Sequence, residues 1–409
     1  MISKIFESCV KEKLLNYLEH IRYLSASQFG FRTGKSTDTA LFKHVTEITE
    51  SIEQNKAAVG VYLDLAKAFD TVSHQRLIKK LEKIGVEGPL LDWFQSYLAN
   101  RKHRVKVGEA FSGELELSYG VPQGSVLGPI LFIIYINDLY QLPLKAKVTG
   151  FADDTSLLYS ATSRLEVEQK LKHDCDIMIP WFRENKLSLN INKCKCVVYA
   201  YKEPGWATTF EIQMGGDKIE RVDNIKYLGL LIDEKLIWKH HLNSLQGKLR
   251  KLNYLFFHMK NFFNQKHLIK LYSPLYESVM SYGQIHWGAS AHTKPVEVLQ
   301  NKVCRNILSL PKMEPKSSIY PQMKKMSLKN LYKYKMLMFT FKNKETFQVK
   351  KSLCASRAGG GQVAGYVGCS RLQSRYKGVE IFNKLPEHIR NQEKIGLFKK
   401  EIRKFLDNT

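Results

Sequence analysis

Two adjacent aspartates, Asp153 and Asp154, interrupt the segment KVTGFADDTSLLYS at residues 147–160, which is otherwise apolar and β-forming. A buried, unpaired carboxylate costs free energy, and a second carboxylate beside it adds repulsion between like charges. The pattern predicts two strands joined by a tight turn that contains the pair, because aspartate tolerates turn geometry. Such a pair can be a turn and nothing more, so a metal site requires a further ligand.

Asp64 offers that ligand. It lies near the end of AAVGVYLDL at residues 57–65, a continuous β-prone run typical of a strand buried on both faces. One interpretation of Asp64 is an N-cap for the following helix. Together with the aspartate pair, it indicates a two-metal site for phosphoryl or nucleotidyl transfer. Mg²⁺ prefers carboxylate oxygens and Mn²⁺ also accepts them, so we expect one of these cations.

The charge of the chain indicates a polyanionic partner. Lysine and arginine number 63 against 39 aspartates and glutamates, which gives a net charge of +24. Such an excess favours nucleic acid as the partner, ahead of an anionic membrane. The longest apolar run, VLGPILFIIYI at residues 126–136, is too short to span a bilayer. No signal-peptide pattern opens the chain and its seven cysteines form no CxxC pair, so we expect an intracellular protein with reduced thiols and no membrane contact.

The order of patterns along the chain predicts its organisation. Helical periodicity covers residues 2–24, a glycine-containing basic loop covers 29–37, and strands are expected over 187–199 and 224–233. From about residue 235 to 345 the chain is helical, basic and rich in aromatic residues, and residues 356–371 form a glycine-rich linker or loop. We expect most of the aromatic rings around residues 254–263 to lie in a helical core. We expect the pair His240 and His241 to face solvent.

Three segments in order, VYLDLAKAFDTVSH, YGVPQGSVLGPILFIIYINDL and GFADDTSLLYS, closely resemble motifs A, B and C of reverse transcriptases, best those of non-LTR retrotransposons. SQFGFRTGKSTDTAL resembles the preceding finger motif, LSLNINKCKCVVY motif D, and IKYLGLLID the primer-grip motif E. The resemblance implies an α+β right-hand polymerase with partial fingers (1–56), a palm with an antiparallel sheet (57–235), a helical thumb (236–345) and a C-terminal extension (346–409).

The resemblance also implies roles for residues in motifs A, C and D. Asp64, Asp153 and Asp154 would be catalytic and metal-binding, with the backbone carbonyl of Leu65 completing one metal shell. Lys193 would protonate the leaving pyrophosphate. A lone lysine on a strand is more often a surface residue without such a role. Phe69 would be the steric gate against a ribose 2′-hydroxyl, with core packing as the other interpretation.

Further residues would bind the nucleic acid or the nucleotide. Gly120, Pro122, Gln123 and Gly124 of motif B would contact the template and the nascent base pair, since glycine permits close backbone approach. Arg32 and Lys35 of the finger loop are candidates for phosphate or template contacts. In motif E, Tyr227, Leu228 and Gly229 would hold the primer.

The implied function is RNA-directed DNA polymerisation on an RNA template with a DNA primer and dNTPs, in the nucleus by resemblance alone. SKIFE at residues 3–7 resembles the tail of an earlier finger motif, so we expect an N-terminally truncated copy. A non-catalytic, nucleic-acid-binding remnant is therefore the main alternative. A group II intron maturase is another. A viral-type RNA-dependent RNA polymerase is disfavoured by Ala152 before the aspartates and by Phe69.

Overall fold

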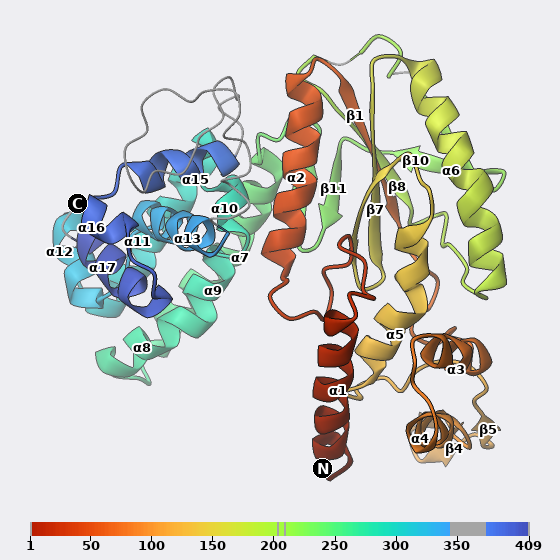
Figure 1. Ribbon diagram of the computed structural model, residues 1–409. Helices are drawn as coiled ribbons and strands as arrows, with labels where there is room; N and C mark the ends of the chain where they lie inside the picture. Colours follow the sequence, from red (N-terminus) through yellow and green to blue (C-terminus); the bar gives the residue numbers. More distant parts are fainter. Residues whose placement is uncertain (1, 203, 208–209, 344–373, 408–409) are drawn as a thin grey trace. The chain divides into compact units, whose positions relative to one another are not determined.

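The computed structural model describes residues 2–202, 204–207, 210–343 and 374–407 (Figure 1). The chain divides into two compact units, Met1–Asp223 and Asn224–Thr409, and each is described by itself. This division falls before the hairpin over 224–233, which the resemblance assigns to the palm. The domain bounds inferred from the sequence remain predictions.

A six-stranded sheet organises the first unit, in the order β6-β7-β1-β8-β10-β9. Its neighbours are antiparallel except for β8 and β10, which pair in parallel. The strands are β1 (Ala57–Leu63), β6 (Lys147–Phe151), β7 (Asp154–Ala161), β8 (Lys195–Tyr199), β9 (Ile212–Met214) and β10 (Asp217–Arg221). The strand expected over 187–199 is therefore shorter, and Leu189 forms only an isolated bridge with Leu65.

Helices cover both faces of this sheet, which explains why every residue of β1 is buried (Figure 1). The helices of this unit are α1 (Ile2–His20), α2 (Thr37–Glu53), α3 (His74–Lys83), α4 (Pro89–Leu98), α5 (Gly128–Ile136), the 3₁₀ helix η1 (Asn137–Gln141) and α6 (Arg164–Glu184). Val59 and Val61 face the core that contains α5 and α6. Tyr62, on the opposite face, bonds to His44 of α2.

The longest apolar run forms α5, whose residues Ile130–Ile136 are all buried. Glu7 of α1 reaches the start of this helix, where its Oε2 accepts from the amides of Val126 (2.7 Å) and Leu127 (3.3 Å). A carboxylate at a helix N-terminus satisfies amides that lack intrahelical partners. Two short exposed hairpins follow α4: β2 (Lys102–His103) pairs with β5 (Leu115–Glu116), and β3 (Lys106–Val107) pairs with β4 (Ala110–Phe111).

The second unit is a helical domain that begins with a β-hairpin, β11 (Asn224–Tyr227) and β12 (Leu230–Asp233). Its helices are α7 (Lys239–Met259), α8 (Gln265–Tyr272), the π-helical η2 (Ser273–Glu277), α9 (Ser278–Met280), α10 (Gln284–Trp287), the 3₁₀ helix η3 (Ala291–Thr293), α11 (Lys294–Leu308), α12 (Lys316–Met323), α13 (Leu328–Lys342), α15 (Ser374–Asn383), α16 (Glu387–Arg390) and α17 (Ile395–Asp407).

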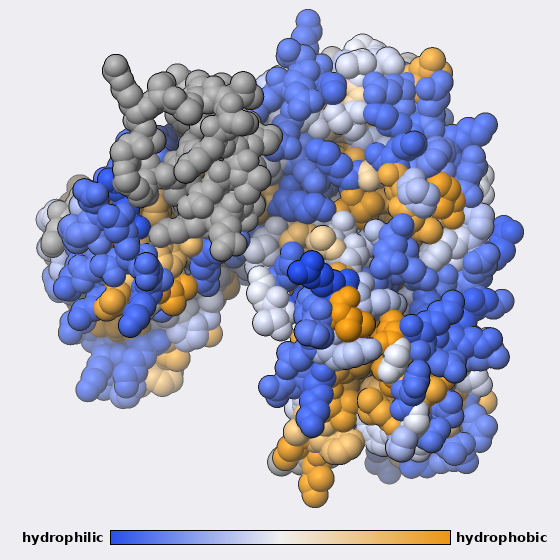
Figure 2. Space-filling view, viewed as in Figure 1, coloured by the Kyte–Doolittle hydropathy of each residue, from blue (hydrophilic) through white to orange (hydrophobic). Residues whose placement is uncertain are grey.

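The prediction of an α+β polymerase fold with an antiparallel sheet and a helical C-terminal part is confirmed. The expected glycine-rich segment at 356–371 lies outside the described residues. Within the described ranges, no helix combines the length and apolarity needed to cross a membrane. The face of the molecule seen in Figure 2 is largely hydrophilic, and hydrophobic residues gather at the free end of α1, where Ile2, Ile5 and Phe6 are exposed.

Candidate active site

The aspartate pair stands at the tip of the β6–β7 hairpin, as the sequence predicts. Phe151 pairs with Asp154, which leaves Ala152 and Asp153 as a two-residue turn. Ala152 has a φ of 58°, in the left-handed region that residues with a Cβ rarely adopt. Hairpin turns of this length need such a φ at their first central position. The turn is therefore held in a conformation that Ala152 does not favour by itself.

Gln28 holds this turn from a different part of the chain. Its side chain is fully buried, and its Oε1 accepts from the amides of Ala152 (3.1 Å) and Gly30 (2.7 Å). Its Nε2 donates to the carbonyl of Ala152 (3.4 Å) and to the hydroxyl of Tyr140 (3.3 Å). The backbone around Gln28 also pairs with β6, since Phe29 N donates to Gly150 O (2.8 Å). These bonds satisfy the buried amide of the turn and fix the hairpin tip.

Asp64 follows β1, the strand that pairs directly with β7, so it lies next to the aspartate pair. The register of β1 and β7 places Leu63 opposite Thr155, so that Asp64 leaves β1 beside the start of β7, where Asp154 stands. The backbone of Asp64 is fixed by Asn190, whose amide donates to the Asp64 carbonyl (2.8 Å). Leu65, the next residue, is buried and bridges to Leu189. All three carboxylates therefore lie where the neighbouring strands β1 and β7 meet at one end of the sheet.

The electrostatics of the three carboxylates reflect this proximity. Partial burial, followed by the negative charges of Asp153 and Asp64, raises the pKa of Asp154 to about 6. Burial and the charge of Asp64 also raise the pKa of Asp153. Lys193 is the nearby cation, with its Nζ 4.0 Å from Oδ1 of Asp64, and both side chains are well exposed. Negative charge at this edge is therefore only partly compensated by the protein itself.

The reverse transcriptase motifs imply a divalent metal at these carboxylates. Among the described residues, no group of three or more His, Cys, Asp or Glu side chains is arranged to hold a metal ion by itself. The uncompensated charge at the β1 and β7 ends nevertheless fits a divalent cation, because cations lower the cost of gathered carboxylates. Mg²⁺ is usually held by one or two carboxylates, with water and substrate phosphates completing its shell. The donor set therefore fits the metal in charge and chemistry.

Phe69 follows Asp64 on the loop that leads to α3. Its ring stacks on Phe132 of α5, with the centroids 4.5 Å apart and an interplanar angle of 29°. Its carbonyl accepts from the amide of Val121 (2.8 Å). The side chain thus packs against the core and is only partly buried, so both interpretations of Phe69 remain compatible with its position.

The motif B segment runs close to this loop. Gly120 has a φ of 91°, and a Cβ there would approach the backbone of Asp70 at 3.0 Å, so only glycine fits without strain. Gln123 is exposed, and its Nε2 donates to Oδ1 of Asp70 (2.8 Å). Pro122 accepts a bond from Ser125 (2.7 Å), while Gly124 has a φ of 78° and open space around it. Asp70 therefore orients the amide of Gln123.

The two finger-loop cations are placed differently. The Arg32 guanidinium forms a bidentate pair with Glu19 of α1 (2.8 and 2.7 Å) and donates to the carbonyls of Leu24, Ser25 and Gln28. A phosphate contact from Arg32 stays a prediction, and it requires some of these bonds to break. Lys35 lies over the ring of Phe29, 4.6 Å from its centroid, and burial and the charge of Arg32 lower its pKa.

The proposed primer-grip residues lie in the second unit, at the tip of the β11–β12 hairpin. Tyr227 pairs with Leu230, so Leu228 and Gly229 form the turn, both with positive φ (45° and 83°). The hydroxyl of Tyr282 donates to the Leu228 carbonyl (2.7 Å), and its ring leaves no room for a Cβ at Gly229. The hairpin is rigidly built within its own unit, and a contact with primer stays a prediction.

Two expectations for α7 and the turn after it are wrong. Of the rings around 254–263, Phe256 is buried, but Tyr254 (69% exposed), Phe257 (60%) and Phe262 (83%) lie on the surface. Of the histidine pair, His240 is exposed as expected, but His241 is buried, and burial lowers its pKa to about 4. The exposed rings lie beside the exposed cations Arg250, Lys251 and Lys260.

Sequence reasoning missed Gln28, Asp70 and Glu7, each of which supports a segment of the site. Gln28 and Glu7 lie inside quoted motifs, but their partners are backbone amides far away in the chain. Asp70 offered a signal that could have been used: a carboxylate directly follows Phe69 within the quoted segment VYLDLAKAFDTVSH. The functional roles of all the residues above remain predictions.

Comparison with known proteins identifies the family. Residues 1–232 match the family described as reverse transcriptase (RNA-dependent DNA polymerase). The probable RNA-directed DNA polymerase from transposon BS of Drosophila melanogaster is 29% identical over 325 residues, which cover 76% of this chain and 35% of the relative. The RNA-directed DNA polymerase from mobile element jockey of Drosophila funebris is 29% identical over 329 residues, with the same coverage. The chain thus spans about a third of the length of these relatives.

Among solved structures, telomerase from Candida tropicalis in complex with a TWJ fragment of telomeric RNA aligns with a TM-score of 0.43 and 12% identity, covering 99% of this chain and 56% of that one. Telomerase from Candida albicans, also in complex with such a fragment, aligns with a TM-score of 0.40 and 14% identity, covering 78% of this chain and 57% of that one. The family match covers more than half of the chain. This protein belongs to the reverse transcriptase (RNA-dependent DNA polymerase) family.

Proposed function

We propose that this chain is the RNA-directed DNA polymerase of a non-LTR retrotransposon, which extends a DNA primer on an RNA template with dNTPs. The observation that carries the proposal is the meeting of Asp64, Asp153 and Asp154 at the ends of the adjacent strands β1 and β7. The raised pKa of Asp154, about 6, supports a site built to receive positive charge. Such an enzyme would act on chromosomal DNA, so we propose a nuclear location.

The three aspartates and the carbonyl of Leu65 would hold Mg²⁺, with Mn²⁺ as a substitute. When bound, the metal would supply charge stabilisation for nucleotidyl transfer. Lys193, 4.0 Å from Asp64, is close enough to the carboxylates to donate a proton to the departing pyrophosphate. Its exposure leaves the side chain room to reach that group.

Phe69 would exclude ribonucleotides. Its stacking on Phe132 and the hydrogen bond that its carbonyl accepts from the Val121 amide restrict both ring and backbone, so the ring is not easily displaced by a 2′-hydroxyl. Gly120, Pro122, Gln123 and Gly124 would face the template and the nascent base pair. Because Asp70 accepts from Nε2 of Gln123, the amide oxygen of Gln123 is directed elsewhere and is available to a nucleotide.

The exposed rings of the second unit suit a nucleic-acid strand. Aromatic side chains stack on bases of any sequence, and neighbouring lysines and arginines follow the phosphates. Tyr254 and Phe257 of α7 meet both conditions, because Arg250 and Lys251 lie one turn before Tyr254 and about two turns before Phe257. Arg32, Lys35 and the Tyr227–Gly229 turn are further proposed contacts.

Primer extension tests the function. The full chain is given an RNA template with a DNA primer, Mg²⁺ or Mn²⁺, and separate pools of dNTPs and rNTPs. Incorporation of dNTPs that is lost in Asp153→Asn and in Asp64→Asn supports the proposal. Salt-sensitive binding of the primer–template without any incorporation under both metals would refute polymerisation and favour a nucleic-acid-binding remnant.

A further inference from the structure

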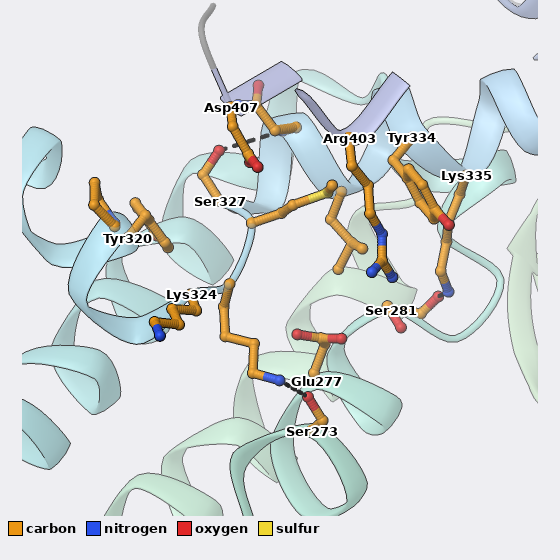
Figure 3. A pocket seen from close by; sticks show the side chains of 15 residues that line it. Ser273, Glu277, Ser281, Tyr320, Lys324, Ser327, Tyr334, Lys335, Arg403 and Asp407 are labelled. Atoms are coloured by element: carbon orange, nitrogen blue, oxygen red, sulfur yellow. Dashed lines mark hydrogen bonds between the residues drawn. The ribbon is translucent and has the colours of Figure 1, made fainter. Parts of the chain in front are cut away.

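A basic pocket lies within the second unit, well separated in sequence from the proposed catalytic residues (Figure 3). Its volume is about 720 Å³, and its walls come from η2, the end of α12 with the link to α13, α13 itself and α17. This is within the range of pockets that bind small molecules or a short part of a larger one. None of the roles proposed above uses it.

The charges that line the pocket are unequal. Lys324, Lys325, Lys335 and Arg403 are opposed only by Glu277 and Asp407, four positive charges against two negative, which leaves a net charge of +2. Figure 3 shows Arg403 and Lys335 reaching into the pocket toward Glu277 and Ser281, whereas Lys324 points away from Glu277. The excess indicates an anionic ligand.

The cations are held in place before any ligand arrives. Lys325 donates to the Ser273 hydroxyl (2.7 Å), and Lys335 donates to the Ser281 carbonyl. The Arg403 guanidinium lies over the ring of Tyr334, with its central carbon 5.4 Å from the ring centroid. A guanidinium held over a ring keeps its in-plane N–H donors directed outward, which suits bidentate recognition of a phosphate. Such preorganisation reduces the entropy lost on binding.

Glu277 occupies the place of an anion among these cations. Burial raises its pKa, while Lys325, Lys335 and Arg403 act in the opposite direction. A carboxylate in this position balances the cations when the pocket is empty, and it repels an incoming anion. The site is therefore built so that a stronger, multiply charged anion competes with Glu277 for the same donors.

We propose that this pocket binds a phosphate group of a single-stranded nucleic acid, with Glu277 as the internal counter-ion that the phosphate replaces. The choice of a nucleic acid over other phosphorylated ligands rests on the proposed function. The phosphate would be contacted by Arg403 and Lys335, and the serine hydroxyls would supply neutral donors. A free nucleotide shares this chemistry and is distinguished by competition.

Binding of a short fluorescein-labelled single-stranded RNA to the full chain, without dNTPs, tests the proposal. The pocket variant is Lys335→Gln/Arg403→Gln, and the matched control is Lys266→Gln/Lys312→Gln, which removes two exposed positive charges elsewhere in the same unit. We expect the pocket variant to bind about tenfold more weakly and to lose about 0.7 from the slope of log K against log salt, since each neutralised phosphate contributes roughly 0.7 for single strands. The control should bind within about twofold of the wild type, because exposed charges away from a contact contribute little.

Glu277→Gln is the second variant. It keeps the shape of the side chain and removes the competing charge, so we expect it to bind the RNA severalfold more tightly than the wild type. This gain cannot come from loss of folding. Equal weakening by the pocket and control variants, or an unchanged affinity of Glu277→Gln, would overturn the proposal.

Adenosine monophosphate at millimolar concentration separates the two sources of phosphate. If it binds the wild type more tightly than the pocket variant while the two proteins bind the RNA equally, the pocket takes a free nucleotide and the assignment to a strand is overturned. If the RNA itself binds the wild type more tightly than the pocket variant, a strand phosphate is supported. Because these assays measure binding without turnover, failure of polymerisation leaves them interpretable.

Discussion

Removal of the Gln28 side-chain bonds should disable the catalytic hairpin while leaving the carboxylates themselves intact. Gln28→Met preserves the length and approximate volume of the side chain and removes every bond to the turn. The amides of Ala152 and Gly30 then lose their acceptor. Both residues are buried, so water does not replace it easily.

The cost follows from these two amides. A buried donor left unsatisfied costs about 1–3 kcal/mol, so the variant should lose about 2–6 kcal/mol of unfolding free energy. Ala152 already has an unfavourable φ, so without the Gln28 bonds the backbone of its turn should move to a less strained conformation. A shift of about 1 Å in a reacting group can cost roughly a hundredfold in rate, so we expect a fall in kcat of that order.

Tyr140→Phe is the matched control. Tyr140 is partly buried beside Gln28 and its hydroxyl bonds to Gln28, Ala152 and Thr155, yet its loss leaves the Gln28 oxygen on the Ala152 amide. We expect it to lose only about 1 kcal/mol, typical of one hydrogen bond, and to keep kcat within several-fold of the wild type.

The assay is steady-state primer extension, well below the melting temperature of each variant, with Mg²⁺ varied. Displaced carboxylates bind the metal less tightly, so Gln28→Met should need more Mg²⁺ for half-maximal rate, whereas a merely structural role would leave this value unchanged. Wild-type kcat at the wild-type Mg²⁺ requirement, despite lost stability, would refute the positioning role of Gln28.

Three further perturbations test other parts of the molecule. Asp153→Asn should abolish primer extension, yet be at least as stable as the wild type at neutral pH without metal, since burial and Asp64 raise the Asp153 pKa and so disfavour the charged form; lower metal-free stability by urea titration would contradict this. His44 is fully buried against Tyr62, and burial lowers its pKa to about 3. The unfolded chain, with a histidine pKa of about 6.5, then binds the extra proton as pH falls from about 6.5 to 3, so stability is lost over that window at up to about 1.4 kcal/mol per pH unit. His44→Gln should lower the acid slope of the unfolding free energy by that amount, and an unchanged slope would show that His44 protonates in the folded state. Tyr254→Ala/Phe257→Ala should change stability by less than about 1 kcal/mol because both rings are exposed, while weakening single-strand binding by roughly tenfold or more; unchanged binding would remove these rings from the nucleic-acid surface.

The position of the three carboxylates could be predicted from the sequence, because the residue types and the strand-like hydrophobic pattern around them were informative enough. An aspartate after a fully apolar strand and a pair inside a β-forming segment each point to strand ends. The β1–β7 register then brings Asp64 beside Asp154, as three strand-end carboxylates require. The same reasoning assigned Arg32 to a mobile phosphate-binding loop from composition alone. It had no means to see that Glu19, on the preceding helix, is the bidentate partner of Arg32.

The exposed rings of α7 could have been predicted from helical spacing, but the prediction was made from residue type instead. The buried stripe of α7 runs through Leu242, Leu245, Leu249, Asn253 and Phe256, at helical spacings of three and four. Continued along the helix, that spacing selects Phe256 and leaves Tyr254 and Phe257 on other faces. Hydrophobicity alone had placed most of these rings in the core.

Gln28 marks the boundary of what a single sequence can predict. A two-residue turn with a buried, non-glycine residue at positive φ demands an acceptor for its amide, and this demand is predictable in principle. The residue that meets it lies 124 positions earlier in the chain, and any buried polar side chain would satisfy the rule equally well. Choosing among them requires the parallel contact between residue 28 and β6, which no period or motif encodes. The proposed catalytic carboxylates can therefore be predicted from the residues around them in the sequence. Gln28, which holds their turn in place, can be identified only from the fold.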